Sequence, residues 1–245
     1  DVCSSDLGAT YVGLDAAVGR MKVAATWPAK TGDGCADFFG TALSAFNPDI
    51  PSNASVLEIG SAEYDWLTPA HKAWPDMSLV GIDWRGAKKT PVGARVVQGD
   101  AMVASHFPPA SFDWIVSISA MEHMGLGHYA RDPKDEDGDV KVMTNAYAWL
   151  KPGGYMYLDV PWNAGEDAYQ VWGTSHRVYD DATIQSRLLR GWWPSTTASS
   201  VPRVVRWRGV VTRKLVSVLL YETPRRTGGE DFYYLGLWLQ KPESA

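Results

Sequence analysis

A short apolar run that stops at a glycine constrains this chain more than any other stretch. Val56–Ile59 is rich in β-branched residues and ends at Gly60, which predicts a buried strand that feeds a tight turn. A helical stretch follows at about residues 64–74, and a second apolar run, Leu79–Ile82, ends at Asp83. Strand, glycine turn, helix, strand and acid is the order of a βαβ unit that binds a nucleoside-containing cofactor.

Gly60 and Asp83 suit such a cofactor for different reasons. Glycine lets the backbone approach a ligand closely, and a carboxylate at the end of the second strand can accept hydrogen bonds from ribose hydroxyls. Residues 61–63 are Ser-Ala-Glu, so the glycine series of a dinucleotide fingerprint is absent. This absence disfavours an NAD-type oxidoreductase, and we expect a cofactor that places no pyrophosphate on the helix N-terminus.

Strands and helices continue to alternate up to about residue 160. The expected elements are strands at Ala94–Gln98, Phe112–Ile118 and Tyr155–Val160 and a helix at Val140–Leu150, which Lys151–Gly154 should stop. Such alternation predicts an α/β fold with a doubly wound, mainly parallel sheet. Cys35–Phe46 has helical spacing, and two interpretations stay open: it covers one side of a cofactor cleft, or it is a plain packing helix.

The last third of the chain is less regular. Asp180–Arg190 is expected to be a helix. Val210–Tyr221 and Phe232–Leu239 are β-rich runs on either side of a turn region at Glu222–Asp231. We expect these two runs to form an antiparallel hairpin at one edge of a seven-stranded sheet.

Composition limits the classes of function. With 245 residues and 45% hydrophobic content, the chain can bury one sizeable core, and we expect residues 8–245 to form a single domain. A formal net charge of -5 gives no electrostatic reason to expect a nucleic acid or an anionic membrane as partner. No apolar run approaches the about 18 residues that a membrane-spanning helix needs.

The first seven residues look foreign to the protein. Asp1–Leu7 resembles the translation of a common sequencing adapter, which suggests a gene assembled from environmental DNA. Without Cys3 a lone Cys35 remains, so no disulfide framework is expected. No signal peptide is visible, and the expected location is the cytoplasm.

Five blocks together resemble the class I S-adenosylmethionine-dependent methyltransferases. They are Val56–Gly60, Gly81–Asp83, Gly99–Ala101, Phe112–Ser119 and Leu150–Gly154, in the family's order. The resemblance implies a Rossmann-like fold and S-adenosyl-L-methionine as the cofactor. It implies as cofactor-binding residues Glu58, Gly60, Ser61, Asp83, Trp84, Asp100, Ala101, Ser119 and Met121. Ser61 and Glu63 stand where the family usually has glycines.

A narrower resemblance covers residues after the fourth expected strand. Glu122–Tyr129, the Asp-Gly-Asp turn at Asp137–Asp139 and Ser175–Tyr179 are similar to motifs of a poorly characterised methyltransferase-like family. Its pattern has Arg where this chain has His128, and Asn-Ala where this chain has Thr174 and Ser175. That family has no established substrate to suggest.

His123 is the candidate general base, with Glu122 beside it. His123 follows the end of the fourth strand, where open α/β sheets bind ligands, and imidazole titrates near neutral pH. Methyl transfer to a hydroxyl or amine requires a group that removes the acceptor's proton. A structural histidine, bonded to backbone or to Glu122, is the alternative. His and Asp residues nearby also invite a metal interpretation, but the Asp135–Asp139 run lacks a calcium loop's later glutamate, so no metal is expected.

His176, Arg177 and Tyr129 are the candidate substrate-binding residues. The planar guanidinium of Arg177 could clamp a carboxylate or phosphate, although pairing with Asp180 or Asp181 is the simpler interpretation. The leading function is methyl transfer to the hydroxyl of a small molecule or glycan. The alternative is a non-catalytic binding module with the same fold.

Overall fold

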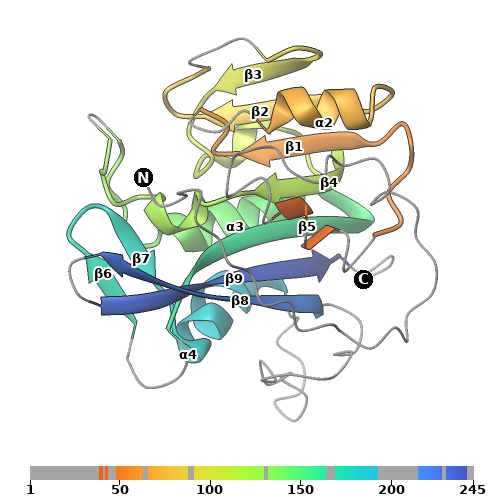
Figure 1. The fold of residues 1–245 in the computed structure, drawn as a ribbon. Helices are drawn as coiled ribbons and strands as arrows, with labels where there is room; N and C mark the ends of the chain where they lie inside the picture. Colours follow the sequence, from red (N-terminus) through yellow and green to blue (C-terminus); the bar gives the residue numbers. More distant parts are fainter. Residues whose placement is uncertain are drawn as a thin grey trace.

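A twisted sheet with helices on both faces is the framework of the molecule (Figure 1). The computed structural model describes residues 39–40, 42–43, 48–62, 66–87, 91–129, 132–163, 169–192, 215–227 and 230–241. In these residues the sheet has seven strands in the order β3-β2-β1-β4-β5-β9-β8. The strands are β1 (Ser55–Ile59), β2 (Ser78–Asp83), β3 (Ala94–Gln98), β4 (Phe112–Ser117), β5 (Leu150–Trp162), β8 (Leu215–Thr227) and β9 (Glu230–Gln240).

The strand directions confirm a mainly parallel sheet with an antiparallel strand near the C-terminus. β1 to β5 pair in parallel, and β9 runs antiparallel to both β5 and β8, so six strands share one direction. Leu220 pairs with Leu235, which confirms the predicted hairpin at the sheet edge. Residues 210–214 of the first predicted run lie outside the described residues.

Central strands are buried on both faces. β1 is the middle of the parallel part, where Leu57 pairs with Val80 on one side and Ile115 on the other, and all three are buried. Strands covered on both faces have near-continuous apolar sequences rather than alternating ones, which is what made Val56–Ile59 and Leu79–Ile82 recognisable.

Two cores lie against the two faces of the sheet. On one face, α3 (Gly138–Trp149) packs Val142 and Ala146 into a cluster with Leu57. On the other, α2 (Leu67–Ala73) and helical residues near Phe39 pack with Trp66 and the tryptophans of the strands. Phe39 lies 5.7 Å from Trp114 between ring centroids. Figure 1 shows α2 and α3 on opposite faces. The described residues near Phe39 are therefore core, and residues 1–38, with the predicted foreign segment, lie outside the description.

Three elements differ from the sequence predictions. β5 begins at Leu150, directly after α3, so Lys151–Gly154 is part of the strand and pairs with Lys241 through Gly153 and Gly154. The predicted helix at Asp180–Arg190 is broken into α4 (Asp181–Thr183), the π-helical η4 (Ile184–Leu188) and the 3-10 turn η5 (Arg190–Trp192). A hairpin of β6 (Gln170–Trp172) and β7 (His176–Val178) was not predicted.

Candidate active site

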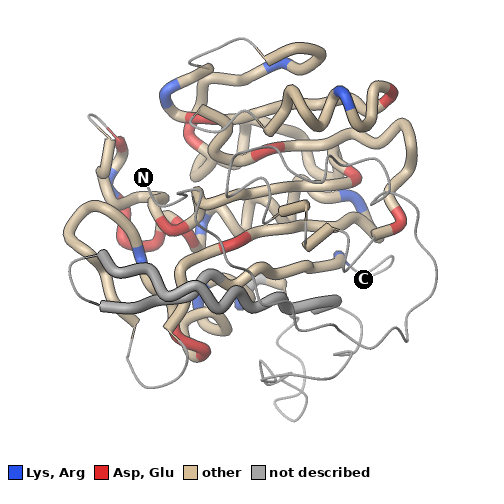
Figure 2. Tube along the Cα trace, in the orientation of Figure 1, with Lys and Arg blue, Asp and Glu red and all other residues tan. Residues whose placement is uncertain are grey.

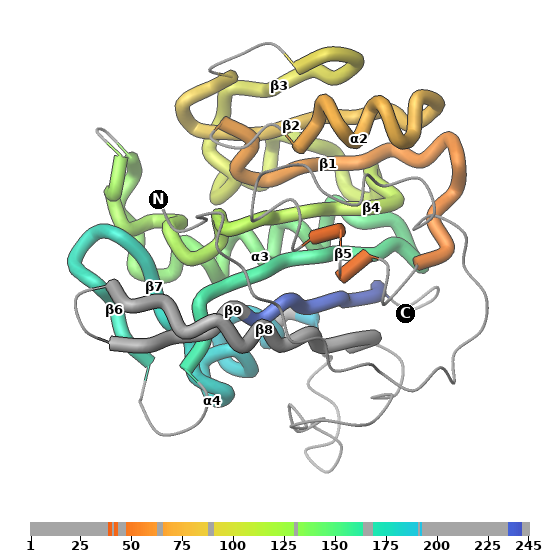
Figure 3. The backbone as a smooth tube through the Cα atoms, viewed as in Figure 1, coloured from red at the N-terminus to blue at the C-terminus, as the bar shows by residue number. Residues whose placement is uncertain are grey.

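A cleft lies at the carboxyl ends of the parallel strands, where open α/β sheets bind ligands. It encloses about 720 Å³, a volume that includes space open to solvent. Its lining consists of Gly60, Ile82–Arg85, Gly99–Met102, Ser119, Ala120, His123–Gly125, Tyr129, Asp132 and Pro133. Figure 3 shows the β6–β7 hairpin beside the segment that follows β4, and β7 contacts the 3-10 turn η3 (Met121–His123).

Gly60 allows the first loop to turn tightly over the strand ends. Its φ is +88°, and a Cβ at this position would lie 2.3 Å from the Cβ of Ala120. The next residue is accommodated by a second glycine, because a Cβ on Gly81 would lie 2.5 Å from the Ser61 hydroxyl. Gly81 thus makes room for the Ser61 side chain in the first loop.

Asp83 joins the first loop to the second. Its Oδ2 accepts a hydrogen bond from the Ala62 backbone at 3.1 Å, and its Oδ1 accepts from the Arg85 backbone at 2.8 Å and from Arg85 Nε at 3.1 Å. The Arg85 guanidinium lies over the Tyr129 ring, 3.7 Å from its centroid. Arg85 is a cleft residue that the sequence did not single out, although it follows the expected ribose acid by two positions.

The remaining predicted cofactor residues fall into two groups. Trp84 (39% exposed), Asp100, Ala101 and Ser119 line the cleft. Asp100 accepts a hydrogen bond from the Met102 backbone at 2.8 Å, and Asn145 of α3 donates to the Ala101 carbonyl at 2.9 Å. Glu58 and Met121 are buried, and neither is part of the lining.

Ser119 is held in an unusual backbone conformation by a buried acid. Its φ is +43°, and its backbone N–H donates to Asp159 Oδ1 at 2.6 Å. The Tyr157 hydroxyl donates to Asp159 Oδ2 at 3.0 Å. Burial raises the pKa of Asp159 to about 8. The sequence signal for this residue was an acid inside the apolar run Tyr155–Val160.

His123 lies at the cleft with its protonation pattern fixed by a neighbour. Its Nδ1 is 2.5 Å from the Ser175 carbonyl, which can only accept, so Nδ1 carries the proton and Nε2 keeps its lone pair. Nε2 makes no hydrogen bond with any described residue. Burial, together with the charge of Arg85, lowers the pKa of His123 below its ordinary value. The ring is therefore a neutral imidazole at neutral pH.

Glu122 is a buried acid next to His123. It is 0% exposed, and neither carboxylate oxygen has a hydrogen-bond partner among the described residues. Its Oε1 lies 3.8 Å from His123 Nε2. Burial raises the pKa of Glu122 to about 8, although the nearby charge of Arg177 acts in the opposite direction. Such a perturbed acid beside a neutral imidazole is typical of functional sites.

The three predicted substrate residues are placed differently from one another. Tyr129 lines the cleft. His176 lies next to His123, 6.3 Å between ring centroids, but is buried behind it, and burial lowers its pKa to about 4. Arg177 is 1% exposed and donates to the Met124 carbonyl at 2.6 Å, so it holds backbone instead of clamping a substrate in the cleft.

The ring cluster around His123 also includes His128, whose ring is stacked at 5.4 Å. In the part of the chain that the structure describes, no group of three or more His, Cys, Asp or Glu residues is arranged to hold a metal ion. No helix among those residues is long and apolar enough to cross a membrane.

Comparison with known proteins places this geometry in a fold family. The family named Caenorhabditis protein of unknown function, DUF268, matches residues 101–201. No curated protein matches the chain. Among solved structures, the [4+2]-cyclase SpnF has a TM-score of 0.54 and 13% identity, over 85% of this chain and 83% of that one.

A second solved structure is phosphoethanolamine N-methyltransferase 2 of Haemonchus contortus, in complex with phosphomonomethylethanolamine and S-adenosylhomocysteine. It has a TM-score of 0.52 and 13% identity, over 82% of this chain and 52% of that one. The chain therefore has the Rossmann-like fold of S-adenosylmethionine-dependent methyltransferases. A protein named as a cyclase shares the fold, so fold alone does not settle the reaction.

Proposed function

We propose that this chain is an S-adenosylmethionine-dependent methyltransferase that acts on the hydroxyl of a small molecule or glycan. The observation that carries the proposal is His123, a neutral imidazole with a lone pair on Nε2, at the carboxyl end of β4 in a cleft that Gly60 and Asp83 also line. A binding module would have no need of a proton acceptor held at this place.

The cleft residues fit the cofactor. Gly60 lines the cleft in a turn so close to Ala120 that a Cβ would clash, and its bare backbone would face the amino-acid part of the ligand. Asp83 would accept hydrogen bonds from the ribose hydroxyls, and Trp84, Asp100 and Ala101 would surround the adenine. When bound, the cofactor supplies an electrophilic methyl group on a sulfonium.

His123 would take the proton that the acceptor hydroxyl loses as the new O–CH3 bond forms. The proton goes to Nε2, and the Nδ1–H bond to the Ser175 carbonyl stabilises the resulting imidazolium. Glu122 Oε1 lies 3.8 Å from the same nitrogen, and above its raised pKa of about 8 the ionised carboxylate would stabilise the imidazolium further. Tyr129 and Arg85, stacked on each other in the cleft lining, would contact the acceptor and restrict water.

Binding of the ribose must compete with Arg85, which already uses both oxygens of the Asp83 carboxylate. At one oxygen, ribose hydroxyls can replace the bond from the Arg85 side chain. The backbone donors of Ala62 and Arg85 keep their bonds to the carboxylate. The proposal therefore needs no movement of the strands.

Isothermal titration with S-adenosylmethionine, S-adenosylhomocysteine and NAD tests the cofactor. We expect the first two to bind and Asp83→Ala to weaken binding by about 1.5–3 kcal/mol, the cost of a lost charge-assisted hydrogen bond. The matched control is Asp76→Ala, an exposed acid in the turn before β2, which should leave affinity unchanged. Equal affinity in Asp83→Ala and wild type would reject the assignment.

Turnover is tested separately. Methyl-tritiated cofactor is incubated with pooled hydroxylated metabolites and with glycan fractions, and label transfer is followed. Cofactor binding with no transfer to any pool would favour the non-catalytic module, and NAD binding in place of S-adenosylmethionine would reject both.

A further inference from the structure

The segment between η3 and α3 carries part of the cleft lining on a loop that returns to its starting point. We call residues 124–138 the cleft loop. Its described residues include Tyr129, Asp132 and Pro133, all of which line the cleft. Acidic residues gather around this loop, as Figure 2 shows.

Two glycines close the neck of the cleft loop. The Asp135 backbone donates to the Gly125 carbonyl at 2.8 Å. A Cβ on Gly138 would lie 2.6 Å from the Met124 carbonyl oxygen and 2.7 Å from Gly125 Cα. The two ends of the loop are therefore in backbone-to-backbone contact, which no larger residue would permit.

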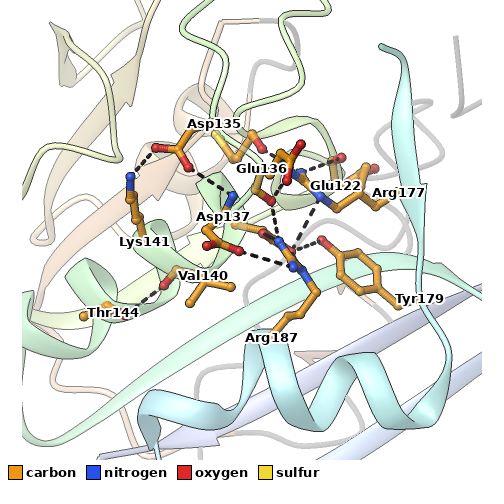
Figure 4. Close-up of polar contacts among 12 residues, drawn as sticks. Glu122, Asp135, Glu136, Asp137, Val140, Lys141, Thr144, Arg177, Tyr179 and Arg187 are labelled. Atoms are coloured by element: carbon orange, nitrogen blue, oxygen red, sulfur yellow. Dashed lines mark hydrogen bonds and ion pairs between the residues drawn. The ribbon is translucent and has the colours of Figure 1, made fainter. Parts of the chain in front are cut away.

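Arg177 spans this neck from β7. Its Nη1 donates to the Met124 carbonyl at 2.6 Å and reaches the Glu122 carbonyl at 3.4 Å, and its Nη2 donates to the Glu136 carbonyl at 3.2 Å. One buried guanidinium thus ties the end of η3, which bears His123, to the far end of the cleft loop. Figure 4 shows Arg177 between Glu122 and Glu136.

Asp139, at the start of α3, anchors this arrangement. It is 0% exposed and lies 3.8 Å from Arg177 Nε. Arg187 of η4 binds both its oxygens, at 3.0 and 2.6 Å, and the Tyr179 hydroxyl donates to it at 2.9 Å. Arg187 also donates to the Glu136 carbonyl at 2.5 Å. The carboxylate is fully satisfied, which a buried charge requires.

We propose that Arg177 is a positioning residue that, anchored by Asp139, holds His123 and the cleft loop in the geometry needed for proton removal from the acceptor. The proposal rests on the proposed function, because His123 is the base there. It gives a common role to three sequence motifs: the glycines after His123, the Asp-Gly-Asp turn, and Arg177 with Tyr179.

An arginine is required here for a geometric reason. The three carbonyls lie on two separate segments, and a planar fork with several N–H groups can serve them together. A lysine would keep the positive charge beside Asp139, but it has one nitrogen in place of the two with which Arg177 binds the Met124 and Glu136 carbonyls. Arg177→Lys therefore removes the clamp and keeps the charge.

The test compares Arg177→Lys with Arg190→Lys, an exposed arginine of η5 outside the network. We expect methyl transfer to fall about 10²-fold in Arg177→Lys, the cost of a misplacement of about 1 Å. Cofactor affinity by titration should stay within about twofold, because Gly60 and Asp83 belong to other strands. Arg190→Lys should match wild type in both.

Nitrogen-15 NMR of the histidine rings reports which ring nitrogen of His123 carries the proton. A purely structural role of Arg177 would leave this protonation pattern unchanged. In wild type the His123 ring should show a protonated Nδ1 and a bare Nε2. In folded Arg177→Lys we expect a tautomer mixture, because the turn that aims Nδ1 at Ser175 is released. This arm needs neither cofactor nor acceptor, so it remains decisive if the proposed function fails.

Tyr179→Phe is the second variant, because Arg177→Lys could fail to fold. It removes only the hydroxyl that donates to Asp139 and keeps the ring, so we expect the same loss of transfer and the same tautomer mixture, each smaller than in Arg177→Lys. A folded Arg177→Lys with wild-type His123 signals would overturn the proposal. So would a loss of cofactor affinity as large as the loss of transfer, or unfolding of both variants.

Discussion

Four predicted site residues illustrate what a sequence can and cannot show at the scale of one side chain. His123, Asp83 and Tyr129 line the cleft because they follow strand ends or a loop that the topology brings there. Arg177 has the residue type of an anion clamp and stands next to His176, yet it is buried against carbonyls. From residue type alone, Arg177 was expected to bind substrate in the cleft like the others. Its burial depends on the β6–β7 hairpin, which the sequence did not predict.

His123→Ala tests the base directly. We expect methyl transfer to fall by about 10²–10⁴-fold, the usual contribution of a general base, while the affinity for S-adenosylmethionine changes little. His71→Ala on α2, outside the cleft, is the matched control. Unchanged transfer in His123→Ala would leave His123 with a structural role.

The two buried acids predict how stability depends on pH. Burial raises the pKa of both Glu122 and Asp159 to about 8, so between about pH 4 and pH 8 the folded state binds more protons than the unfolded chain. Stability from these groups is fully present below the unfolded pKa and is lost as pH rises through the folded pKa. Thermal midpoints should fall from pH 6 to pH 8.

Glu122→Gln should make the fall of the thermal midpoint with pH less steep. The variant lacks one titrating group, and it also lacks the Glu122 charge that raises the pKa of Asp159. The exposed Glu136→Gln is the control and should follow wild type. Parallel curves for wild type and Glu122→Gln would show that Glu122 does not titrate in this range.

At the scale of elements, the local sequence pattern predicted the buried strands. It failed where pairing between distant strands sets the bounds of an element. β3 has the predicted bounds, Ala94–Gln98, because a β-rich run there ends at a glycine. Lys151–Gly154 has the composition of a stop signal, but pairing of Gly153 and Gly154 with Lys241, 87 or more residues away, extends β5 through it. No window of local sequence contains that partner.

The helix after β7 shows the same limit in another form. Asp180 caps its start by accepting a hydrogen bond from the Thr183 backbone at 2.7 Å. The next turn widens into π-helical η4, which places Arg187 on Asp139. The π-helical turn lets Arg187 bind the buried Asp139 of α3. Helical periodicity contains no information about that partner, so it predicted a regular helix.

At the scale of the whole molecule, the mainly parallel sheet and a cleft at the carboxyl ends of its strands could be predicted from the sequence, because a doubly wound sheet binds ligands at that edge. The sequence did not decide the role of the helix expected near Phe39. It could cover one side of the cleft or pack against the sheet. The structure places Phe39 among four buried aromatic rings, Trp66, Trp114, Tyr157 and Trp238, and outside the cleft lining.

Phe39→Ala should therefore destabilise the fold and leave the site intact. Phe39 is 0% exposed, with ring centroids 5.1 Å from Tyr157 and 5.4 Å from Trp66, so truncation opens a cavity that costs about 3–5 kcal/mol. Urea unfolding followed by tryptophan fluorescence measures the loss, with Val103→Ala at an exposed position as control. Affinity of the folded variant for S-adenosylmethionine should match wild type. A variant that kept its stability but lost the cofactor would place this segment at the cleft after all.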